Sequence, residues 1–350
     1  MEKPTLVTGA NGHLGYNICR LLVERGEPVR AMIRATADPK PLEALGVSIV
    51  RGDILDAAAA AVAVEGVRRV HHTAAGFLMW AKDPEKEIIR PSVEGTRNVV
   101  AAAAKAGVEK IVYTSTTGTM GFSLTPDRLI DESHHIENPH TYYVRGKVAA
   151  EQEAYQVAAK TGLALCSTHP GFILGPRFFK LSESVRQVSD FLNNGMPVYF
   201  DGGFSAVDVE DVARGSLLAM EKGRPGERYI LAGENVTVKG LFDVLAELTG
   251  LKAPSIKAPV PLLRVLAAAM ELGSKLTGAR PMLDRSQVDE FAGKYAYFDS
   301  SKAERELGYT HLSARDTLRR TVAWLIDQGF VTERRKSLMK LDPSLAGAYG

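Results

Sequence analysis

The chain has 350 residues, 45% of them hydrophobic and 24% charged, with a formal net charge of +2. This composition excludes a disordered, collagen-like or coiled-coil chain, and the charge gives no reason to expect a nucleic-acid partner. Only two cysteines are present, so no disulfide framework is available; we expect free buried thiols at Cys19 and Cys166 and a cytoplasmic protein.

Short β-branched runs alternate with alanine-rich helical segments through the first half of the chain. The strands are apolar on both faces, which is typical of a parallel sheet covered by helices on both sides. The expected strands span 5–8, 29–34, 47–53, 67–73, 110–114 and 163–169, and the expected helices span 14–25, 42–45, 57–64, 91–106 and 143–161.

The alternation breaks after residue 171. We expect irregular structure over 172–200, a strand and a helix over 205–222, and helices separated by Pro and Gly from 235 to 330. The predicted fold is therefore an α/β, Rossmann-type doubly wound parallel sheet with a smaller, interleaved C-terminal α/β substrate-binding region. The first domain spans 1–170 and is rejoined at about 205–232; the second comprises 171–204 and 233–330; the charged tail 331–350 is expected to be partly mobile.

The segment 261–277 is the longest helical candidate of the second half. It carries Arg264, Glu271 and Lys275, and we interpret it as an amphipathic helix that covers a pocket or a core. A membrane-surface role is the alternative. We expect no signal peptide and no integral membrane segment, because no apolar stretch is long enough to span a bilayer.

A glycine-rich turn follows the first strand and opens the first helix. Gly9 allows a tight turn, Gly12 lets a pyrophosphate approach the backbone, and Gly15 lets the helix pack on the strand. The helix N-terminus adds N–H donors for the phosphates. The alternative is a plain glycine turn. His13 is expected to be an exposed residue of the loop. The residues expected to contact a dinucleotide here are Thr8, Gly9, Asn11, Gly12, His13, Leu14 and Gly15.

The end of the second strand indicates which dinucleotide binds. NAD-specific sites require an acidic residue there to accept hydrogen bonds from the ribose hydroxyls, and this strand has none. Arg34 is instead placed to bind a 2′-phosphate through its forked guanidinium. NADP is therefore the predicted cofactor, with NAD less favoured; the alternative is that Arg34 is a solvated surface residue.

Tyr143 and Lys147 stand four residues apart at the start of a predicted helix, on one face. Carbonyl reduction needs a proton donor at oxygen, and a nearby ammonium group lowers the pKa of a phenol toward the useful range. Lys147 is also expected to bind the nicotinamide ribose. Tyr142 is the weaker candidate because Gly146 lies four residues after it. The strand before this helix ends in the hydroxyl cluster Ser115, Thr116 and Thr117, which strand-end turn chemistry explains in part.

With these motifs the chain resembles the extended short-chain dehydrogenase/reductases over about residues 4–325. The shared segments are the glycine turn, Asp53–Ile54, Ala74–Gly76, Val93–Asn98, Thr114–Thr116, Tyr143–Lys147, His169–Gly171 and Asp208–Ala213. The resemblance implies that Asp53 and Ile54 contact the adenine, that Ala74 and Ala75 pass the ribose, and that Pro170 contacts the nicotinamide. It also aligns the catalytic hydroxyl with Thr116, where Thr replaces the usual Ser.

Within this group the chain is most similar to the dihydroflavonol-4-reductase-like branch, which lies near the 3β-hydroxysteroid dehydrogenases and includes hopanoid-associated sugar epimerases. The resemblance implies an NADP(H)-dependent reductase of a ketone or aldehyde, or a dehydrogenase of the alcohol, with Thr116, Tyr143 and Lys147 catalytic. The alternatives are a sugar epimerase or dehydratase and a 3β-hydroxysteroid dehydrogenase-like enzyme; a non-catalytic dinucleotide sensor is a third class. Ser92, where many epimerases have Asn, favours the reductases.

The substrate is expected to be a small carbonyl compound or alcohol in a pocket that includes Ser115, Thr117, Phe77 and Phe172. A nucleotide-sugar would need charge from Arg177, Lys180, Arg186 and Arg214, whereas Phe172, Phe178, Phe179, Phe191 and Phe204 indicate an apolar pocket or a core. No metal is expected, because the histidines have no ligand spacing; His71 and His72 are predicted core and sheet-edge residues. Relatives of this fold pair through the helices 91–106 and 143–161, which implies a homodimer.

Overall fold

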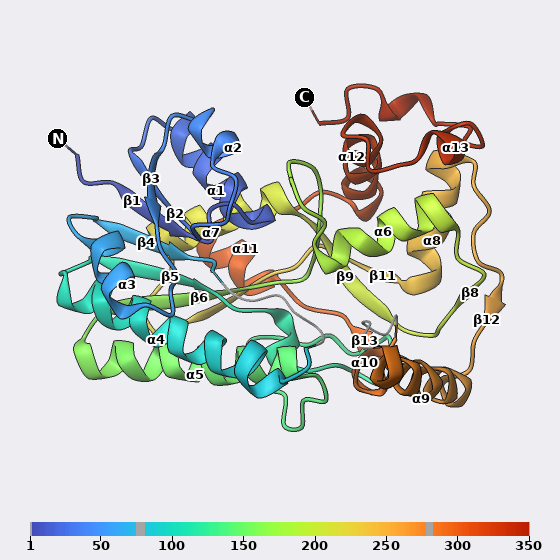
Figure 1. Cartoon of the computed structure of the whole chain (residues 1–350), viewed down its shortest axis with the longest axis horizontal. Coiled ribbons are helices and arrows are strands. Elements are labelled where there is room, and N and C mark those ends of the chain that lie inside the picture. Colours follow the sequence, from blue (N-terminus) through green and yellow to red (C-terminus); the bar gives the residue numbers. More distant parts are fainter. Residues whose placement is uncertain (1, 75–80, 278–282, 350) are drawn as a thin grey trace.

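The computed structural model describes residues 2–74, 81–277 and 283–349, and its centre is a parallel sheet of seven strands (Figure 1). The strand order is β10-β6-β5-β4-β1-β2-β3, and every neighbouring pair is parallel. The strands are β1 (Thr5–Thr8), β2 (Val29–Ile33), β3 (Ser48–Arg51), β4 (Arg69–His72), β5 (Lys110–Thr114), β6 (Ala164–Pro170) and β10 (Arg228–Leu231). The order reverses between β1 and β4, the point where such sheets bind ligands at their carboxyl ends.

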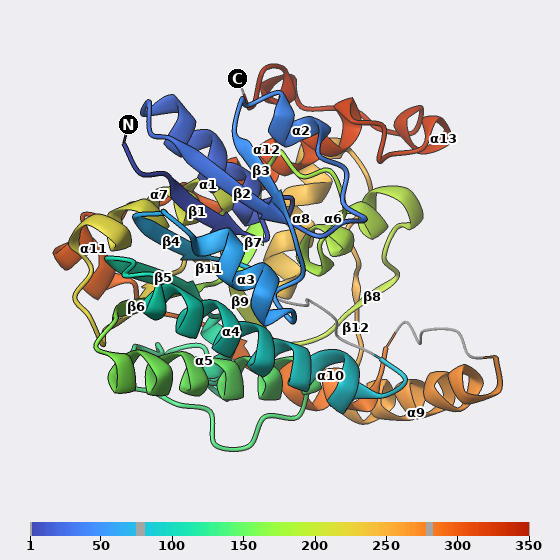
Figure 2. The ribbon, with the colours of Figure 1, turned by 60° about the vertical axis from the view of Figure 1, so that its left-hand side comes forward.

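Helices cover both faces of this sheet, as the doubly apolar strands require. One face packs against α1 (His13–Glu24), α2 (Lys40–Glu43), α7 (Val209–Lys222) and α11 (Ser301–Leu307). The other face packs against α3 (Ala57–Val64), α4 (Arg90–Lys105) and α5 (Tyr142–Thr161). Figure 2 shows α4 and α5 side by side, and their backbones are in contact along the helices. The predicted Rossmann-type doubly wound sheet is confirmed.

A second, smaller unit follows β6. Its four-stranded sheet centres on β9 (Gly203–Asp208), which pairs with β7 (Phe172–Leu174), β11 (Glu234–Thr237) and β13 (Tyr295–Ala296). The helices α6 (Glu183–Asn194), α8 (Val238–Thr249) and α12 (Ala314–Asp327) bury a common core against it. A two-stranded pair, β8 (Val198–Tyr199) with β12 (Ile256–Lys257), leads to α9 (Val260–Thr277) and α10 (Arg285–Phe291).

The expectation of irregular structure over 172–200 is wrong. The segment contains β7, α6 and β8, and α6 begins at a Ser182 cap whose hydroxyl accepts a hydrogen bond from the Val185 amide. Apolar residues recur on one face of α6 at Val185, Val188 and Leu192, and all three are fully buried. The helical period was present in the sequence, but the Phe, Ser and Gly residues around it concealed the signal.

The tail after Phe330 also differs from the expected mobile segment. It forms α13 (Glu333–Lys336) and a 3₁₀ turn at Pro343–Leu345, and its backbone donates hydrogen bonds from Lys340 and Asp342 to the end of α8. Leu345 and Ala348 are buried in the core of the smaller unit. The tail therefore contributes apolar residues to the core of the smaller unit. The sequence pattern did not predict this packing, because charged residues surround them.

Three smaller predictions concern buried polar groups and membrane segments. Cys19 and Cys166 are buried and free, as predicted. His71 and His72 are both buried, but β4 lies between β1 and β5, so neither is a sheet-edge residue. Among the described residues, no helix has the length and apolarity needed to cross a bilayer.

The packed tail makes a prediction about stability. Leu345→Ala should lower the free energy of unfolding by about 2 kcal/mol, because a buried leucine side chain is lost and a cavity remains. Urea denaturation measures the change. Leu338→Ala, at a site 59% exposed in the same tail, is the matched control and should be nearly neutral. Equal, negligible effects of both substitutions would show that the tail does not pack as described.

Candidate active site

The turn between β1 and α1 is shaped by backbone approaches that only glycine permits. Gly9 has φ +66°, and a Cβ there would lie 2.8 Å from the Ala74 Cα. A Cβ on Gly15 would lie 2.3 Å from the Gly9 carbonyl oxygen. At Gly12 the backbone is exposed, and a Cβ would meet only the Gly9 oxygen. The turn thus leaves open backbone at the N-terminus of α1, which fits a pyrophosphate group.

Thr8 and His13 hold the surroundings of this turn. The Thr8 hydroxyl is hydrogen-bonded to the His72 Nδ1 at 2.7 Å and accepts from the Ala74 amide at 3.2 Å, so it fixes the end of β4 beside the glycine turn. His13 is half-buried rather than exposed, which corrects the sequence expectation. Its Nε2–H donates to the Pro176 carbonyl at 3.0 Å, and burial lowers its pKa to about 4. Leu14 is buried under the turn, and Asn11 is exposed.

The residues predicted for the adenosine side lie at the ends of β2 and β3. Arg34 and Asp53 are exposed, and Ile54 packs against α4 so closely that a Cβ on Gly95 would lie 2.5 Å from its Cδ1. Arg51 was missed by the sequence reasoning. Its guanidinium donates to the carbonyls of Ala35 and Ala37, at 2.8 and 3.4 Å, and so holds the loop that follows Arg34.

Thr116, Tyr143 and Lys147 come together at the carboxyl end of β5. Helix α5 starts at a Thr141 cap, whose hydroxyl accepts from the Val144 amide. This start places Tyr143 and Lys147 on one face, and the Lys147 ammonium donates to the Thr114 carbonyl at 3.0 Å. Tyr143 makes a side-chain hydrogen bond with Thr116. The hydroxyl of Thr116 in turn accepts from the Gly118 amide at 3.2 Å, which fixes its position.

Burial controls the protonation of this group. It raises the pKa of Tyr143 well above the ordinary phenol value, and the hydrogen bond from Thr116 opposes part of the rise. Burial also lowers the pKa of Lys147 to about 8, which the negative charge of Glu151 partly offsets. The neutral phenol is therefore favoured near neutral pH, and this is the form that can donate a proton to a carbonyl oxygen.

The two other hydroxyls of the cluster are engaged elsewhere. Ser115 donates to the buried Glu151 carboxylate at 2.6 Å, and Thr117 donates to the Pro170 carbonyl at 3.1 Å. Thr116 is thus the one of the three whose side chain contacts Tyr143. Of the remaining predicted residues, Phe172 packs on Phe204 with ring centroids 4.4 Å apart. Phe77 and Ala75 lie outside the described residues.

Two buried carboxylates that the sequence reasoning missed hold α5 in place. Glu151, one turn after Lys147, lies 3.0 Å from the Arg228 Nε, and Arg228 also donates to the carbonyls of Glu132 and His134. Glu290, on α10, accepts from the amides of His140 and Thr141 at 2.6 and 2.7 Å. The start of α5 is therefore bound to the smaller unit of the fold. The i,i+4 spacing of Lys147 and Glu151 could have predicted the position of Glu151. No local sequence pattern predicts the contact of Glu290.

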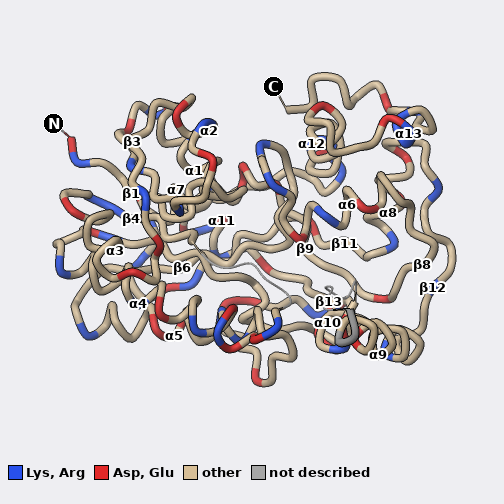
Figure 3. The backbone as a smooth tube through the Cα atoms, viewed as in Figure 1, with Lys and Arg blue, Asp and Glu red and all other residues tan. Residues whose placement is uncertain are grey.

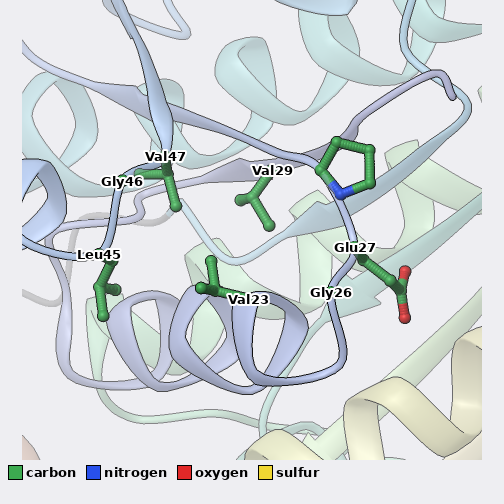
Figure 4. Close-up of a pocket in the computed structure, with 8 residues that line it drawn as sticks. Val23, Gly26, Glu27, Val29, Leu45, Gly46 and Val47 are labelled. Carbon is green, nitrogen blue, oxygen red and sulfur yellow. The ribbon is translucent and has the colours of Figure 1, made fainter. Parts of the chain in front are cut away.

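A shallow depression elsewhere on the sheet is unrelated to this site. It has a volume of about 300 Å³ and lies between the end of α1 and the starts of β2 and β3, lined by Val23, Val29, Leu45 and Val47 (Figure 4). These are the amino ends of the strands, opposite the edge that carries the glycine turn. Among the described residues, no three His, Cys, Asp or Glu side chains gather where they could hold a metal ion.

The fold and the site together define a dinucleotide-binding protein of the Rossmann class, and comparison with known proteins identifies the family. Residues 5–232 match the NAD dependent epimerase/dehydratase family, so the chain belongs to that family. This confirms the predicted resemblance to the extended short-chain dehydrogenase/reductases.

Individual relatives cover nearly the whole chain. A Synechocystis protein provisionally named dihydroflavonol 4-reductase is 35% identical over 331 residues, which are 93% of this chain and 95% of its own. Sterol demethylase protein B of Methylococcus capsulatus is 36% identical over 332 residues, 93% and 99% of the two chains. The crystal structure of gox2253 superimposes with a TM-score of 0.83 at 34% identity, covering 95% of this chain and 100% of that one. The first name agrees with the predicted oxidoreductase class.

The buried ammonium group makes a prediction about pH. Between pH 8 and 10.5 the unfolded chain keeps the Lys147 proton that the native state has lost, so the free energy of unfolding rises with pH. One pKa unit corresponds to about 1.4 kcal/mol. Without cofactor, the free energy of unfolding of the wild type should therefore rise by roughly 3 kcal/mol more than that of Lys147→Met across this window. Urea unfolding at a series of pH values measures the difference. Parallel stability curves for the two proteins would contradict the burial of a titrating Lys147.

Proposed function

We propose that this protein is an NADP(H)-dependent reductase that converts a ketone or aldehyde to an alcohol, or catalyses the reverse oxidation. The observation that supports the proposal most strongly is the assembly of Thr116, Tyr143 and Lys147 at the carboxyl end of β5. That edge also carries the glycine turn of β1, at the switch point of the sheet. A sensor without catalytic activity would need no such assembly.

Each side chain has a defined task in the proposed reaction. Thr116 donates a hydrogen bond to the substrate oxygen and keeps it beside Tyr143. Tyr143 gives its phenolic proton to that oxygen, and in the reverse direction its phenolate accepts the proton from the alcohol. Lys147 supplies the positive charge that stabilises the phenolate and binds the nicotinamide ribose. When bound, the nicotinamide cofactor supplies or accepts the hydride.

The glycine turn and the end of β2 are the parts that would hold the cofactor. The open backbone at Gly12 and the N-terminus of α1 fit the pyrophosphate, and Asp53, Ile54, Ala74 and Pro170 lie along the same edge. Arg34 supports NADP over NAD, because it is an exposed cation at the end of β2. Asp38, the nearest acid in the loop, is exposed and accepts from the Lys40 amide.

The surroundings of the site favour an apolar carbonyl compound over a nucleotide-sugar. Arg177 is paired with Glu210, and Arg214 with Glu210 and Asp211, so these cations already have anionic partners. A dehydratase also needs an additional acid or base, and the 115–119 turn offers only hydroxyls. Phe178 and Phe191 are buried in the core of the smaller unit, the second of the two roles that the sequence left open, so they do not support an apolar pocket. Phe172 and Phe204 are half-buried and carry that argument.

Three features of organisation belong to the same proposal. The segments 171–204 and 233–330 bind the substrate, since α10 and β13 from this part of the chain contact the segment before α5. Helices α4 and α5 form the interface of a homodimer. The cytoplasm is the proposed compartment, in agreement with the two free buried thiols.

Tyr143→Phe should lower kcat for carbonyl reduction by roughly 10²–10⁴-fold, because the proton donor is lost while the ring remains. Oxidation of NADPH, followed by absorbance with a panel of ketones and aldehydes, measures the effect. Tyr142→Phe is the matched control: its ring is 40% exposed, and the substitution should leave kcat unchanged. Equal rates for Tyr143→Phe and the wild type would refute the proposed role. A protein that binds NADPH tightly, reduces no carbonyl and interconverts sugar epimers would be an isomerase.

Arg34→Ala should raise the KM for NADPH by about 10- to 100-fold, as expected when a charged hydrogen bond to a phosphate is lost. The KM for NADH should change little, because NADH lacks the 2′-phosphate. Arg25→Ala, which removes an exposed arginine at the other end of α1, is the control. Equal changes of both KM values would argue against recognition of the phosphate by Arg34.

A further inference from the structure

Helix α9 is apolar on two faces, and the described residues cover only one of them. Leu263 and Ala267 are buried against α10, where Val288 completes a small core. Outside this contact the helix exposes the large apolar residues Leu262, Val265, Leu266, Met270 and Leu272, and Ile256 of β12 is exposed just before the helix. A surface helix normally turns charged residues outward, and one that is apolar all round is normally buried.

Arg264 and Glu271 of α9 are paired with charged residues of α10. The Arg264 guanidinium lies 2.7 Å from an Asp289 oxygen, and the Glu271 carboxylate lies 2.9 Å from the Arg285 guanidinium. Between Val265 and Met270 the sequence contains no charged residue. In Figure 3 the tube of α9 is accordingly mostly tan. The segment from Val265 to Met270 can therefore enter an apolar medium without desolvating a charged side chain.

We propose that α9 lies in the surface of a lipid bilayer and seats the protein on it through this apolar side. The geometry suits such contact, since α9 runs along the margin of the molecule (Figures 1 and 2). Its 18 residues extend about 27 Å, parallel to a membrane rather than across it. A protruding helix can insert its convex side into the bilayer more easily than a flat protein surface can.

Charge complementarity favours lipid over a second copy of the chain. The segment 252–294, which contains β12, α9 and α10, has seven basic and four acidic residues. Asp201, which pairs with Lys257, adds a fifth acidic residue, so the region has an excess of two positive charges. An excess of positive charge is attracted by anionic headgroups and repelled by its own copy. One face of three helical turns is also well short of the roughly 800 Å² per partner that a stable dimer buries.

The position of α9 would bring the bilayer close to the candidate active site. Helix α10, its packing partner, carries Glu290, which is hydrogen-bonded to the start of the catalytic helix. The bilayer would then lie beside the substrate-binding region. An apolar substrate dissolved in lipid would enter from that side, a corollary that rests on the proposed function, whereas the membrane contact itself does not.

Flotation with lipid vesicles tests the contact. Wild-type protein is mixed with vesicles of phosphatidylcholine alone and of phosphatidylcholine with phosphatidylglycerol, and the double variant Val265→Glu/Leu272→Glu is compared. These sites are 66% and 61% exposed, so the variant should fold. Its lipid partition coefficient should fall ~10-fold or more, since two apolar side chains no longer enter the bilayer. Wild-type binding should be stronger to the anionic vesicles.

The matched control is Val62→Glu/Leu338→Glu, which changes the same residue types at 58% and 59% exposure on other faces. It should bind vesicles like the wild type. Reduction of a water-soluble ketone by all three proteins checks folding, and its absence in all three would overturn the reductase but not the membrane contact. Failure of the wild type to float with either vesicle overturns the proposal. So does equal flotation of the two double variants, or a dimer by sedimentation that the α9 variant alone dissociates without any lipid binding.

Discussion

The pair of Glu151 and Arg228 is the interaction on which the carboxyl edge of the sheet and the position of α5 depend. Glu151 belongs to α5 and Arg228 to β10, at the outer edge of the sheet, and Ser115 at the end of β5 joins the same carboxylate. Arg228 adds hydrogen bonds to the carbonyls of the loop that precedes α5. Two charges withdrawn from water are costly unless their hydrogen bonds are satisfied, so each partner constrains the other. The position of α5, and with it Tyr143, follows from that constraint.

The same carboxylate influences the chemistry of the site. Lys147 lies one helical turn before Glu151, and burial would otherwise drive its pKa still lower. Glu151 is itself held as an anion: its pKa is lowered by His169 and Arg228 against the effect of burial. The charge that helps keep Lys147 protonated thus depends on Arg228, a residue outside the reactive group. One network therefore maintains both the position of α5 and the protonation of Lys147. A mutation of Arg228 would change the two together.

Local sequence patterns predicted the sheet and the reactive group because both depend on short spacings. The glycine turn, the Tyr143–Lys147 spacing and the strand-end hydroxyls each occupy a few consecutive residues. The contact between Glu290 and His140 joins residues 150 positions apart, and no periodicity reports it. The orientations of Ser115 and Thr117 also required the structure, because a turn gives neighbouring hydroxyls different partners. Helix α6 was missed for another reason: its buried face is short and its flanks resemble a loop.

The C-terminal region contacts the segments that carry Thr116 and Tyr143. Through Glu290 it contributes a carboxylate to the N-terminus of α5, where an anion interacts favourably with the helix dipole. The strand β13 forms an isolated bridge with Ser123, just after the Thr116–Thr119 turn. These elements therefore contact the segment just before α5 and the chain just after the Thr116–Thr119 turn. A shift of α10 would therefore move the start of α5, which carries Tyr143, through the hydrogen bonds that Glu290 accepts from the His140 and Thr141 amides.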